Sequence, residues 1–247
     1  MENSIYLALS KQLVQRTNMN VIANNIANAN TAGYRAQNLV FEEYLSDPRG
    51  KTTDKAADDE LSFVYNRAQY ENTDPGSLSF TGNNLDVALA GPGFFGIQGP
   101  GDEIMYSRAG QFQRNAEGTL LNSAGFAVAG SGGGDITIPA DSTEIKIDRN
   151  GVVSNQNGQL GQIMVVEFED AQVLEAQGNT LYRSPVEGGP AENTVVSQGQ
   201  VEGSNVQPVV EMTRMIETLR AYQSTQNILQ TENDRLRGAI QKLTKQG

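Results

Sequence analysis

The residues with the most recognisable spacing are glycines that could form a phosphate-binding turn. Residues 91–96, Gly-Pro-Gly-Phe-Phe-Gly, fit the Gly-x-Gly-x-x-Gly pattern of dinucleotide-binding loops. Such a loop needs a helix beginning at its third glycine, whose amino-terminal dipole faces the phosphates, and Gly99-Pro100-Gly101 prevents one. The sequence therefore favours a tight turn that presents Phe94 and Phe95 to a core. The run Gly130–Asp135 lacks the Lys-Ser/Thr pair of a P-loop and predicts a flexible loop.

Clustered carboxylates are the second group that could do chemistry. Asp148–Gly151 begins like a calcium loop but lacks the glycine at the sixth position and the glutamate at the twelfth, so it predicts a hairpin turn. Two clusters, Asp58-Asp59-Glu60 and Glu167 with Glu169 and Asp170, could hold a hard cation or form a glycosidase pair. Charged faces turned to solvent explain both clusters more simply, and this interpretation is favoured.

Composition removes most of the remaining chemistry. The 247 residues include no Cys and no His, which excludes disulfides, thiolate or imidazole metal ligands and the commonest general base. Net charge is −11, and residues 36–207 hold twenty-four acidic against nine basic residues. Such a body repels phosphate, so nucleic acid is not an expected partner. The chain is predicted not to be an enzyme, with no catalytic residues, metal, cofactor or small-molecule substrate.

The two ends of the chain carry helical patterns. No proline occurs before Pro48 or after Pro208. Near the start, apolar residues recur every three or four positions along one helix face, at Ile5, Leu9, Leu13, Met19, Ile22, Ala23 and Ile26. Asparagines that tolerate turns precede Gly33, so the predicted amino-terminal helix, within residues 1–33, ends near Asn28 to Gly33.

The carboxy-terminal pattern is longer and more regular. Within residues 205–247, steps of three and four join Met212, Met215, Leu219, Tyr222, Gln226, Leu229, Asn233, Leu236, Ile240 and Leu243. This spacing predicts a coiled-coil seam in which the polar members, Gln226 and Asn233, fix the register. A long amphipathic helix packed on the chain's own core is the alternative. The coiled coil is favoured because a helix of about 35 residues would be roughly 50 Å long, which exceeds the width of a small domain.

Between these ends the sequence changes character. Residues 75–204 contain most of the glycines, and their short alternating or β-branched runs between glycine turns predict an all-β domain of sandwich or barrel type. Residues 34–74 predict an extended connecting region, in which the polar run Leu45–Ala57 forms a linker or mobile loop. The predicted fold class is α+β. Two terminal helices form a discontinuous coiled-coil layer, with a glycine-rich all-β domain inserted between them.

Several segments resemble one protein family. The asparagine-rich run Ala23–Arg35 is similar to the signature of bacterial flagellar rod and hook proteins. Leu85–Phe95 and Tyr106–Phe112 resemble core strands of the same family, and Val201–Val206 with Arg220–Gln223 resembles its carboxy-terminal helix. These matches occur in the family's order and cover most of the chain.

The resemblance implies a structural subunit of the flagellar basal body, in a self-assembling rod that transmits torque from motor to hook. The opening Ser4–Ser10 and the chain length look most like the proximal-rod member; the distal-rod or hook member, or a non-flagellar extracellular fibre or scaffold, are the alternatives. No run approaches the twenty apolar residues that cross a bilayer and no ordinary signal sequence is present, so export by the flagellar type III apparatus into the periplasmic rod, without cleavage or membrane insertion, is expected.

Expected partners are other rod subunits, copies of this chain and the export apparatus. Contacts between unlike patches on successive copies would propagate as a helical tube. The expected assembly interface consists of the helix positions above together with Asn24, Asn25, Asn28, Asn30, Gly33 and Asn205.

Overall fold

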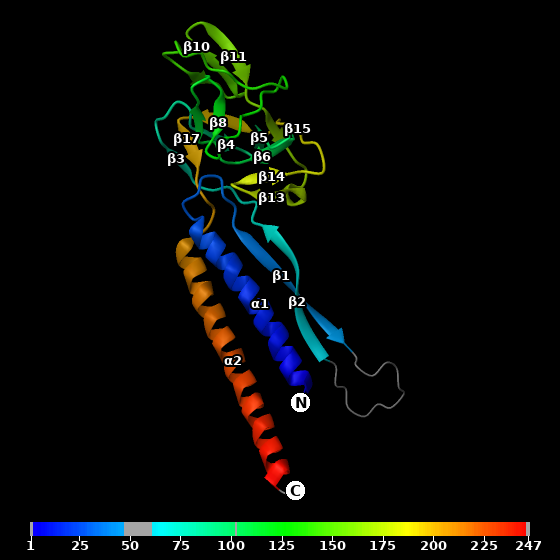
Figure 1. Ribbon diagram of the computed structural model, residues 1–247. Helices are drawn as coiled ribbons and strands as arrows, with labels where there is room; N and C mark the ends of the chain where they lie inside the picture. The colour runs from blue at the N-terminus through cyan, green and yellow to red at the C-terminus, as the bar shows by residue number, and fades with distance from the viewer. Residues whose placement is uncertain (1, 47–60, 102, 246–247) are drawn as a thin grey trace. The chain divides into compact units, whose positions relative to one another are not determined.

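The computed structural model describes residues 2–46, 61–101 and 103–245, which fall into two compact units (Figure 1). The first unit comprises Met1–Ala27, Gln37–Glu71 and Gln207–Gly247, and the second comprises Asn28–Ala36 and Asn72–Val206. Both ends of the chain therefore belong to one unit, and the long middle segment forms the other. This confirms the predicted succession of an amino-terminal helix, a β-rich middle and a carboxy-terminal helix.

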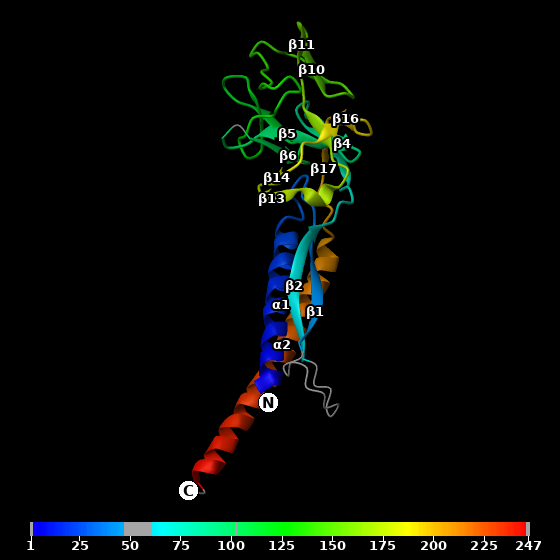
Figure 2. The same ribbon diagram turned by 90° about the vertical axis from the view of Figure 1, so that its right-hand side faces the viewer.

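The first unit is built on two antiparallel helices, α1 (Glu2–Ala27) and α2 (Pro208–Lys245). Figures 1 and 2 show α1 lying along α2, with the first turn of α1 and the last turns of α2 at the same end of the unit. Hydrogen bonds fix this direction, because Asn18 Nδ2 donates to Thr218 Oγ1 at 3.4 Å and Asn25 Nδ2 donates to Glu211 Oε2 at 3.3 Å. With 38 residues against 26, α2 extends beyond α1.

Two long strands pack beside α1 in the same unit. Strands β1 (Gln37–Ser46) and β2 (Leu61–Glu71) pair antiparallel, with one irregularity between Val40 and Phe41. The sequence predicted only a connecting region over 34–74, whereas strands occupy much of it. The signal for them is a high content of β-branched and aromatic residues, which favour strands. Residues 47–60, most of the predicted linker or loop, lie outside the described residues.

The described residues of the second unit form fifteen strands, β3 to β17, and all of their pairings are antiparallel. Its largest sheet has six strands in the order β13 (Glu175–Gly178), β14 (Leu181–Arg183), β6 (Ile104–Ser107), β5 (Phe94–Gln98), β12 (Val165–Glu167) and β15 (Gly189–Pro190). A three-stranded sheet has the order β11 (Gly158–Gln162), β10 (Val152–Asn155), β9 (Lys146–Ile147). The remaining pairs are β16 (Val195–Gln198) with β4 (Val87–Ala90), β17 (Gln200–Glu202) with β3 (Leu78–Phe80), and β7 (Phe112–Arg114) with β8 (Leu120–Asn122). A 3₁₀ turn, η1, covers Ala171–Val173.

Strand β5 separates two hydrophobic clusters, because successive side chains of a strand point to opposite faces. Phe95 and Ile97 belong to the larger cluster, where the Phe95 ring meets the edge of Phe112 with centroids 5.1 Å apart. Phe94 belongs to a smaller aromatic cluster with Tyr182 and Phe168, whose rings lie edge to face against it. The Gly91-Pro92-Gly93 turn thus presents both phenylalanines to cores, which confirms the prediction.

Local turn chemistry also follows the sequence. Helix α1 ends at Ala27, and Gly33 has the positive φ of +67° expected of a residue after a helix end. The Asp148–Gly151 segment is the predicted turn, because Asp148 Oδ1 accepts hydrogen bonds from the amides of Asn150 and Val152, both at 2.9 Å. Neither helix, over its described residues, has a stretch long and apolar enough to cross a membrane.

Candidate assembly surface and buried ion pair

Polar side chains occupy the buried parts of the two terminal helices. Gln15 and Asn25 of α1 and Glu211 and Thr225 of α2 are buried. The Glu211 carboxylate accepts from Asn25 and also pairs with Arg214, whose Nη1 lies 2.8 Å from Oε1. Few apolar groups accompany them, since Ala8, Val21 and Ile22 are the buried hydrophobic side chains among the described residues of both helices. Full burial of apolar side chains is therefore confined to α1 in this helix pair, and the inward apolar side chains of α2 are only half-buried.

Large apolar side chains instead point away from the helix pair. On α1 they are Tyr6, Leu7, Leu9 and Leu13, and on α2 they are Val209, Val210, Met212, Ile216, Leu219, Ile228 and Ile240. Exposed apolar residues occur singly on most proteins, but contiguous groups mark surfaces that bind other proteins. Residues 209, 212, 216 and 219 follow the three-and-four spacing of one face of α2. The side chains of these four residues are termed the outer helix face below.

The inward side of α2 has heptad spacing, but only half of it coincides with the predicted seam. Buried or half-buried positions alternate steps of four and three through Glu211, Met215, Thr218, Tyr222, Thr225, Leu229, Glu232 and Leu236. Met215, Tyr222, Leu229 and Leu236 are members of the predicted seam, whereas its other described members are exposed. In this rotation of α2, Glu211 accepts a hydrogen bond from Asn25 of α1.

The structure places the predicted interface residues at three levels of exposure. Buried members are Ile22, Asn25 and Gly33. Half-buried members are Ile5, Met19, Ile26, Asn28, Asn205, Met215, Tyr222, Leu229 and Leu236. Exposed members are Leu9, Leu13, Ala23, Asn24, Asn30, Met212, Leu219, Gln226, Asn233 and Ile240, and the side chain of Leu243 lies outside the described part of the chain.

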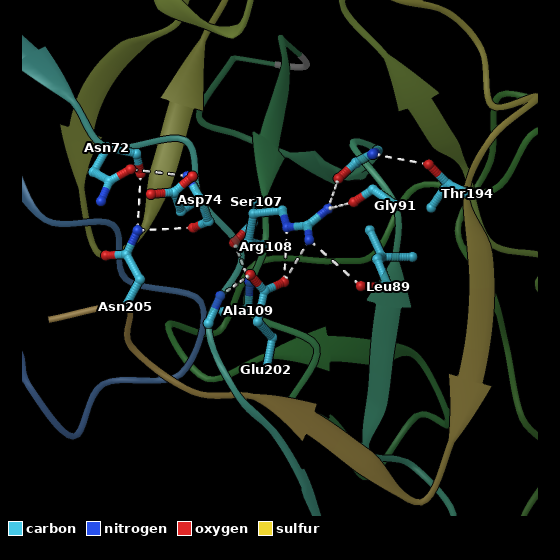
Figure 3. A network of polar contacts seen from close by, with 12 residues as sticks. Asn72, Asp74, Leu89, Gly91, Ser107, Arg108, Ala109, Thr194, Glu202 and Asn205 are labelled. Atoms are coloured by element: carbon cyan, nitrogen blue, oxygen red, sulfur yellow. Dashed lines mark hydrogen bonds and ion pairs between the residues drawn. The ribbon is translucent and has the colours of Figure 1, made fainter.

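Two of the predicted asparagines join segments within the chain. Asn25 Oδ1 accepts from the Gln37 amide and its Nδ2 donates to the Gln37 carbonyl, both at 2.9 Å, which ties α1 to β1. In the second unit, Asn205 Oδ1 accepts from the Ala36 amide at 2.7 Å. Its Nδ2 donates to the carbonyls of Asn72 and Asp74 at 2.9 and 2.8 Å (Figure 3). The side-chain amide of Asn25 therefore holds the start of β1 against α1, and that of Asn205 holds residue 36 near residues 72–74.

A buried ion pair lies at the centre of the second unit's polar network (Figure 3). Arg108, which follows β6 and is 1% exposed, reaches Glu202 at the end of β17. The Arg108 Nε and Nη2 atoms lie 2.8 and 2.6 Å from Glu202 Oε2. Arg108 also donates to the carbonyls of Gly91, at 2.9 Å, and Gly93, which closes the Gly91-Pro92-Gly93 turn.

Both charged side chains also contact backbone groups. Glu202 Oε1 accepts from the Gly76 amide at 3.0 Å, and Arg108 Nη2 lies 3.4 Å from the Leu89 carbonyl. Burial lowers the pKa of Arg108, and the adjacent Glu202 carboxylate opposes that shift. The pair therefore connects four segments, which lie around residues 76, 89–93, 108 and 202.

Gly33 is required at its position for a steric reason. A Cβ atom there would lie 2.3 Å from the Ala109 amide nitrogen, and the residue has positive φ. Its own amide donates to the Glu202 carbonyl at 2.9 Å. We expect Gly33→Ala to lower the free energy of unfolding by about 2 kcal/mol or more, measured by urea denaturation.

The control for this change is Gly132→Ala. A Cβ at Gly132 would meet nothing within 4 Å, so its effect should stay within about 0.5 kcal/mol. Equal stability of the two variants would show that the second unit tolerates a side chain at Gly33.

Two members of the acidic cluster at Glu167, Glu169 and Asp170 accept hydrogen bonds from nearby groups. Glu167 Oε1 accepts from the Thr194 hydroxyl at 2.6 Å and from the Asn193 amide at 2.8 Å. Asp170 Oδ1 accepts from the Gln172 amide at 2.8 Å and caps η1. No group of three or more acidic side chains is arranged to hold a metal ion in the ranges that the structure describes, and Asp58, Asp59 and Glu60 lie outside them.

The Thr194 hydrogen bond gives the second unit a testable dependence on pH. It lowers the pKa of Glu167, so its stabilisation is complete above the unfolded pKa of about 4.3 and is lost as pH falls through the lower folded value. We expect Thr194→Val to lower the free energy of unfolding at pH 7 by about 1 kcal/mol, measured by urea denaturation. The deficit should shrink below about pH 4.

Thr194→Ser, which keeps the hydroxyl, is the control and should follow the parent at each pH. A Thr194→Val deficit of the same size from pH 7 to pH 3 would contradict the hydrogen bond to the ionised carboxylate.

The sequence did not single out Arg108, Glu202, Glu211 or Thr194 as functional. Arg108 and Glu202 are 94 residues apart, and each is an isolated charge near a strand end. The available signal was local: Arg108 and Glu202 both occur within the segments that carry the family resemblance.

An outer helix face of exposed apolar side chains beside a polar helix pair is typical of a surface that contacts another protein. Three family models match in chain order. Residues 5–35 match "Flagella basal body rod protein", residues 88–155 match "Flagellar hook protein FlgE/F/G D1 domain", and residues 197–242 match "Flagellar basal body rod FlgEFG protein C-terminal".

Full-length relatives carry the same family name. The flagellar basal-body rod protein FlgF of Caulobacter vibrioides is 36% identical over 247 residues, which covers 99% of each chain. FlgF of Mesorhizobium japonicum is 33% identical over 91% of each chain, and the rod protein FlgG of Buchnera aphidicola is 33% identical over 94% of this chain and 96% of its own. The chain belongs to the flagellar basal-body rod protein family, a structural family, which argues against an enzymatic role.

Proposed function

We propose that this chain is a structural subunit of the proximal rod of the flagellar basal body, assembling through the outer helix face into a helical tube. The observation that carries the proposal is the inverted polarity of the terminal helices, with polar groups buried and large apolar groups exposed. Each Leu or Ile buried by a neighbour would contribute about 1.5 to 3 kcal/mol. Repetition of one contact between unlike patches builds a helix of subunits.

The coiled-coil seam is part of this proposal. Met212, Leu219, Gln226, Asn233 and Ile240 are exposed in the single chain, so their side chains are accessible to a helix of a neighbouring subunit. With Met215, Tyr222, Leu229 and Leu236 directed inward, α2 would then contact α1 on one side and another subunit on the other. The polar residues Gln226 and Asn233 would select the register of that contact.

The proximal position is supported by two relatives named FlgF. The distal rod is the second candidate because a FlgG relative is 33% identical to this chain, the same identity as one of the FlgF relatives. In the proximal rod the subunit would lie in the periplasm and transmit torque toward the hook. It would reach that place through the type III export apparatus without cleavage.

Deletion of the gene tests the proposal. The null strain is expected not to swim, to stall before hook assembly, and to recover with the intact gene. Electron microscopy of isolated basal bodies, with the chain carrying a tag, would locate it in the proximal or distal rod. A null strain that swims normally would overturn the rod function.

A further inference from the structure

Arg35 is a buried cation without a hydrogen-bonding partner for its Nε atom. Its side chain is 5% exposed, and Nε meets no acceptor. The guanidinium carbon lies 5.0 Å from the centroid of the Phe94 ring, so the aromatic face supplies its nearest favourable contact. No carboxylate lies within ion-pair distance of Arg35 in the described ranges.

A second guanidinium lies near this unpaired charge. Arg108 lies on the same Phe94 ring, at 5.7 Å from its centroid, but Glu202 neutralises it. Like charges repel, and the positive charge of Arg35 further lowers the pKa of Arg108. An unpaired buried charge is costly in a folded chain. Acidic residues are not scarce in this unit, because residues 28–36 and 72–206 contain sixteen acidic and six basic residues.

Both guanidinium groups line one cavity of about 430 Å³. Arg35, Arg108 and Phe168 contribute to its wall, with Gly91-Pro92 and residues 169–172 around it. Glu169 and Asp170 are exposed, and Asp170 is already engaged as the cap of η1. The cavity is large enough to admit a side chain, and Arg35, whose Nε atom has no acceptor, is one of its lining residues.

We propose that this cavity binds the carboxylate of an Asp or Glu side chain from a second copy of this chain in the assembled rod. The planar guanidinium fork matches a carboxylate, and one negative charge balances the charge of Arg35. A phosphate dianion would exceed that charge and meet Glu169 and Asp170. A second copy is the occupant because its acid-rich β unit offers many carboxylates. This inference rests on the proposed self-assembly.

Paired measurements on Arg35→Gln separate an assembly role from a structural role. Removing an unpaired buried charge should leave the Tm of the purified chain equal to or above that of the parent. Recovery of the variant in isolated basal bodies should fall about tenfold or more. Arg35→Lys keeps the charge but loses the planar guanidinium group. Its recovery in basal bodies should lie between those of the parent and Arg35→Gln. The control Arg183→Gln, at an exposed ion pair with Glu103, should assemble like the parent.

A direct probe of the cavity is acetate, titrated into the purified chain at constant ionic strength. The ¹⁵N–¹H signal of the Arg35 Nε, assigned by its absence in Arg35→Gln, should shift with acetate and shift less with phosphate. A larger response to phosphate, or none to acetate, would overturn the carboxylate assignment.

The occupant can be identified by cross-linking from Thr73→Cys, an exposed position at the cavity in a chain without native cysteine. A photoreactive probe attached there, activated in isolated basal bodies, should give a product of twice the chain mass, linked near an Asp or Glu. Cross-linking solely to a different rod protein would overturn the second-copy assignment.

Failure of this inference is distinct from failure of the rod function. A variant Arg35→Gln that assembles like the parent, while the gene deletion abolishes swimming, would overturn the cavity contact alone. A lowered Tm of Arg35→Gln with normal recovery in basal bodies would instead assign Arg35 a structural role. A deletion strain that swims would remove both proposals.

Discussion

Replacement of Arg108 by glutamine is expected to lower the free energy of unfolding by about 3 to 5 kcal/mol, since it leaves a buried carboxylate without its counter-charge. Glu202 is 2% exposed and would retain only its hydrogen bond from the Gly76 amide. The carbonyls of Gly91 and Gly93 would also lose their common donor. Urea denaturation of the purified chain, monitored by circular dichroism in the β region, measures the loss.

Arg183→Gln is the matched control, because it removes an arginine from another ion pair in the same unit. The Arg183 Nε atom lies 2.7 Å from Glu103 Oε1, and the two side chains are 55% and 43% exposed. Solvent screening limits such a pair to about 1 kcal/mol or less. Comparable losses for the two arginines would show that burial does not set the strength of the Arg108 contact.

The paired variant Arg108→Leu with Glu202→Leu should remain less stable than the parent. Apolar replacement of a buried ion pair is often neutral when the two charges bind only each other. Here the arginine also donates to backbone carbonyls, and the glutamate accepts from a backbone amide. These groups would stay buried without partners, at roughly 1 to 3 kcal/mol each. Full stability of the double variant would show that water reaches them.

How much of this structure is predictable from sequence depends on the range of the interactions involved. The turn before Phe94 and Phe95 and the turn at Asp148 are specified by residues within a few positions, and both were predictable. Strands β1 and β2 were not predicted because no glycine turn directly borders them. The polar residues between them led to the prediction of a connecting region instead. Their aromatic and β-branched residues were a usable signal.

Contacts distant in sequence could not be predicted from single residue types. Arg108 and Glu202 pair because strands β6 and β17 bring them together, and Arg35 shares the Phe94 ring of β5 with Arg108. No local pattern in the sequence marks these three charges as belonging to one region. The seam of α2 shows a related limit. Hydrophobicity alone assigns Met212 and Leu219 to the inward side, whereas both are exposed in the structure and the polar residue Glu211 is buried and bonded to Asn25. In a subunit that assembles, the spacing of apolar residues along a helix reflects contacts with other chains as well as contacts within the chain.

The second large expected effect concerns that outer helix face. Leu219→Asp should reduce incorporation into basal bodies by about tenfold or more and abolish swimming, while the free energy of unfolding of the purified chain stays within about 0.5 kcal/mol of the parent. Leu219 is 43% exposed in the single chain, so aspartate costs little there. In the rod, the same position would bury a charge against a neighbouring subunit's apolar surface, which is strongly unfavourable.

Ser224→Asp is the control, since it adds the same charge to α2 at an exposed position roughly 140° around the helix from Leu219. It should assemble and swim, because the added carboxylate lies away from residues 209, 212, 216 and 219. Cofractionation of each variant with basal bodies, together with swimming, gives the comparison. If Leu219→Asp is incorporated as well as Ser224→Asp, the outer helix face is not an assembly surface, and its exposed apolar side chains require another partner.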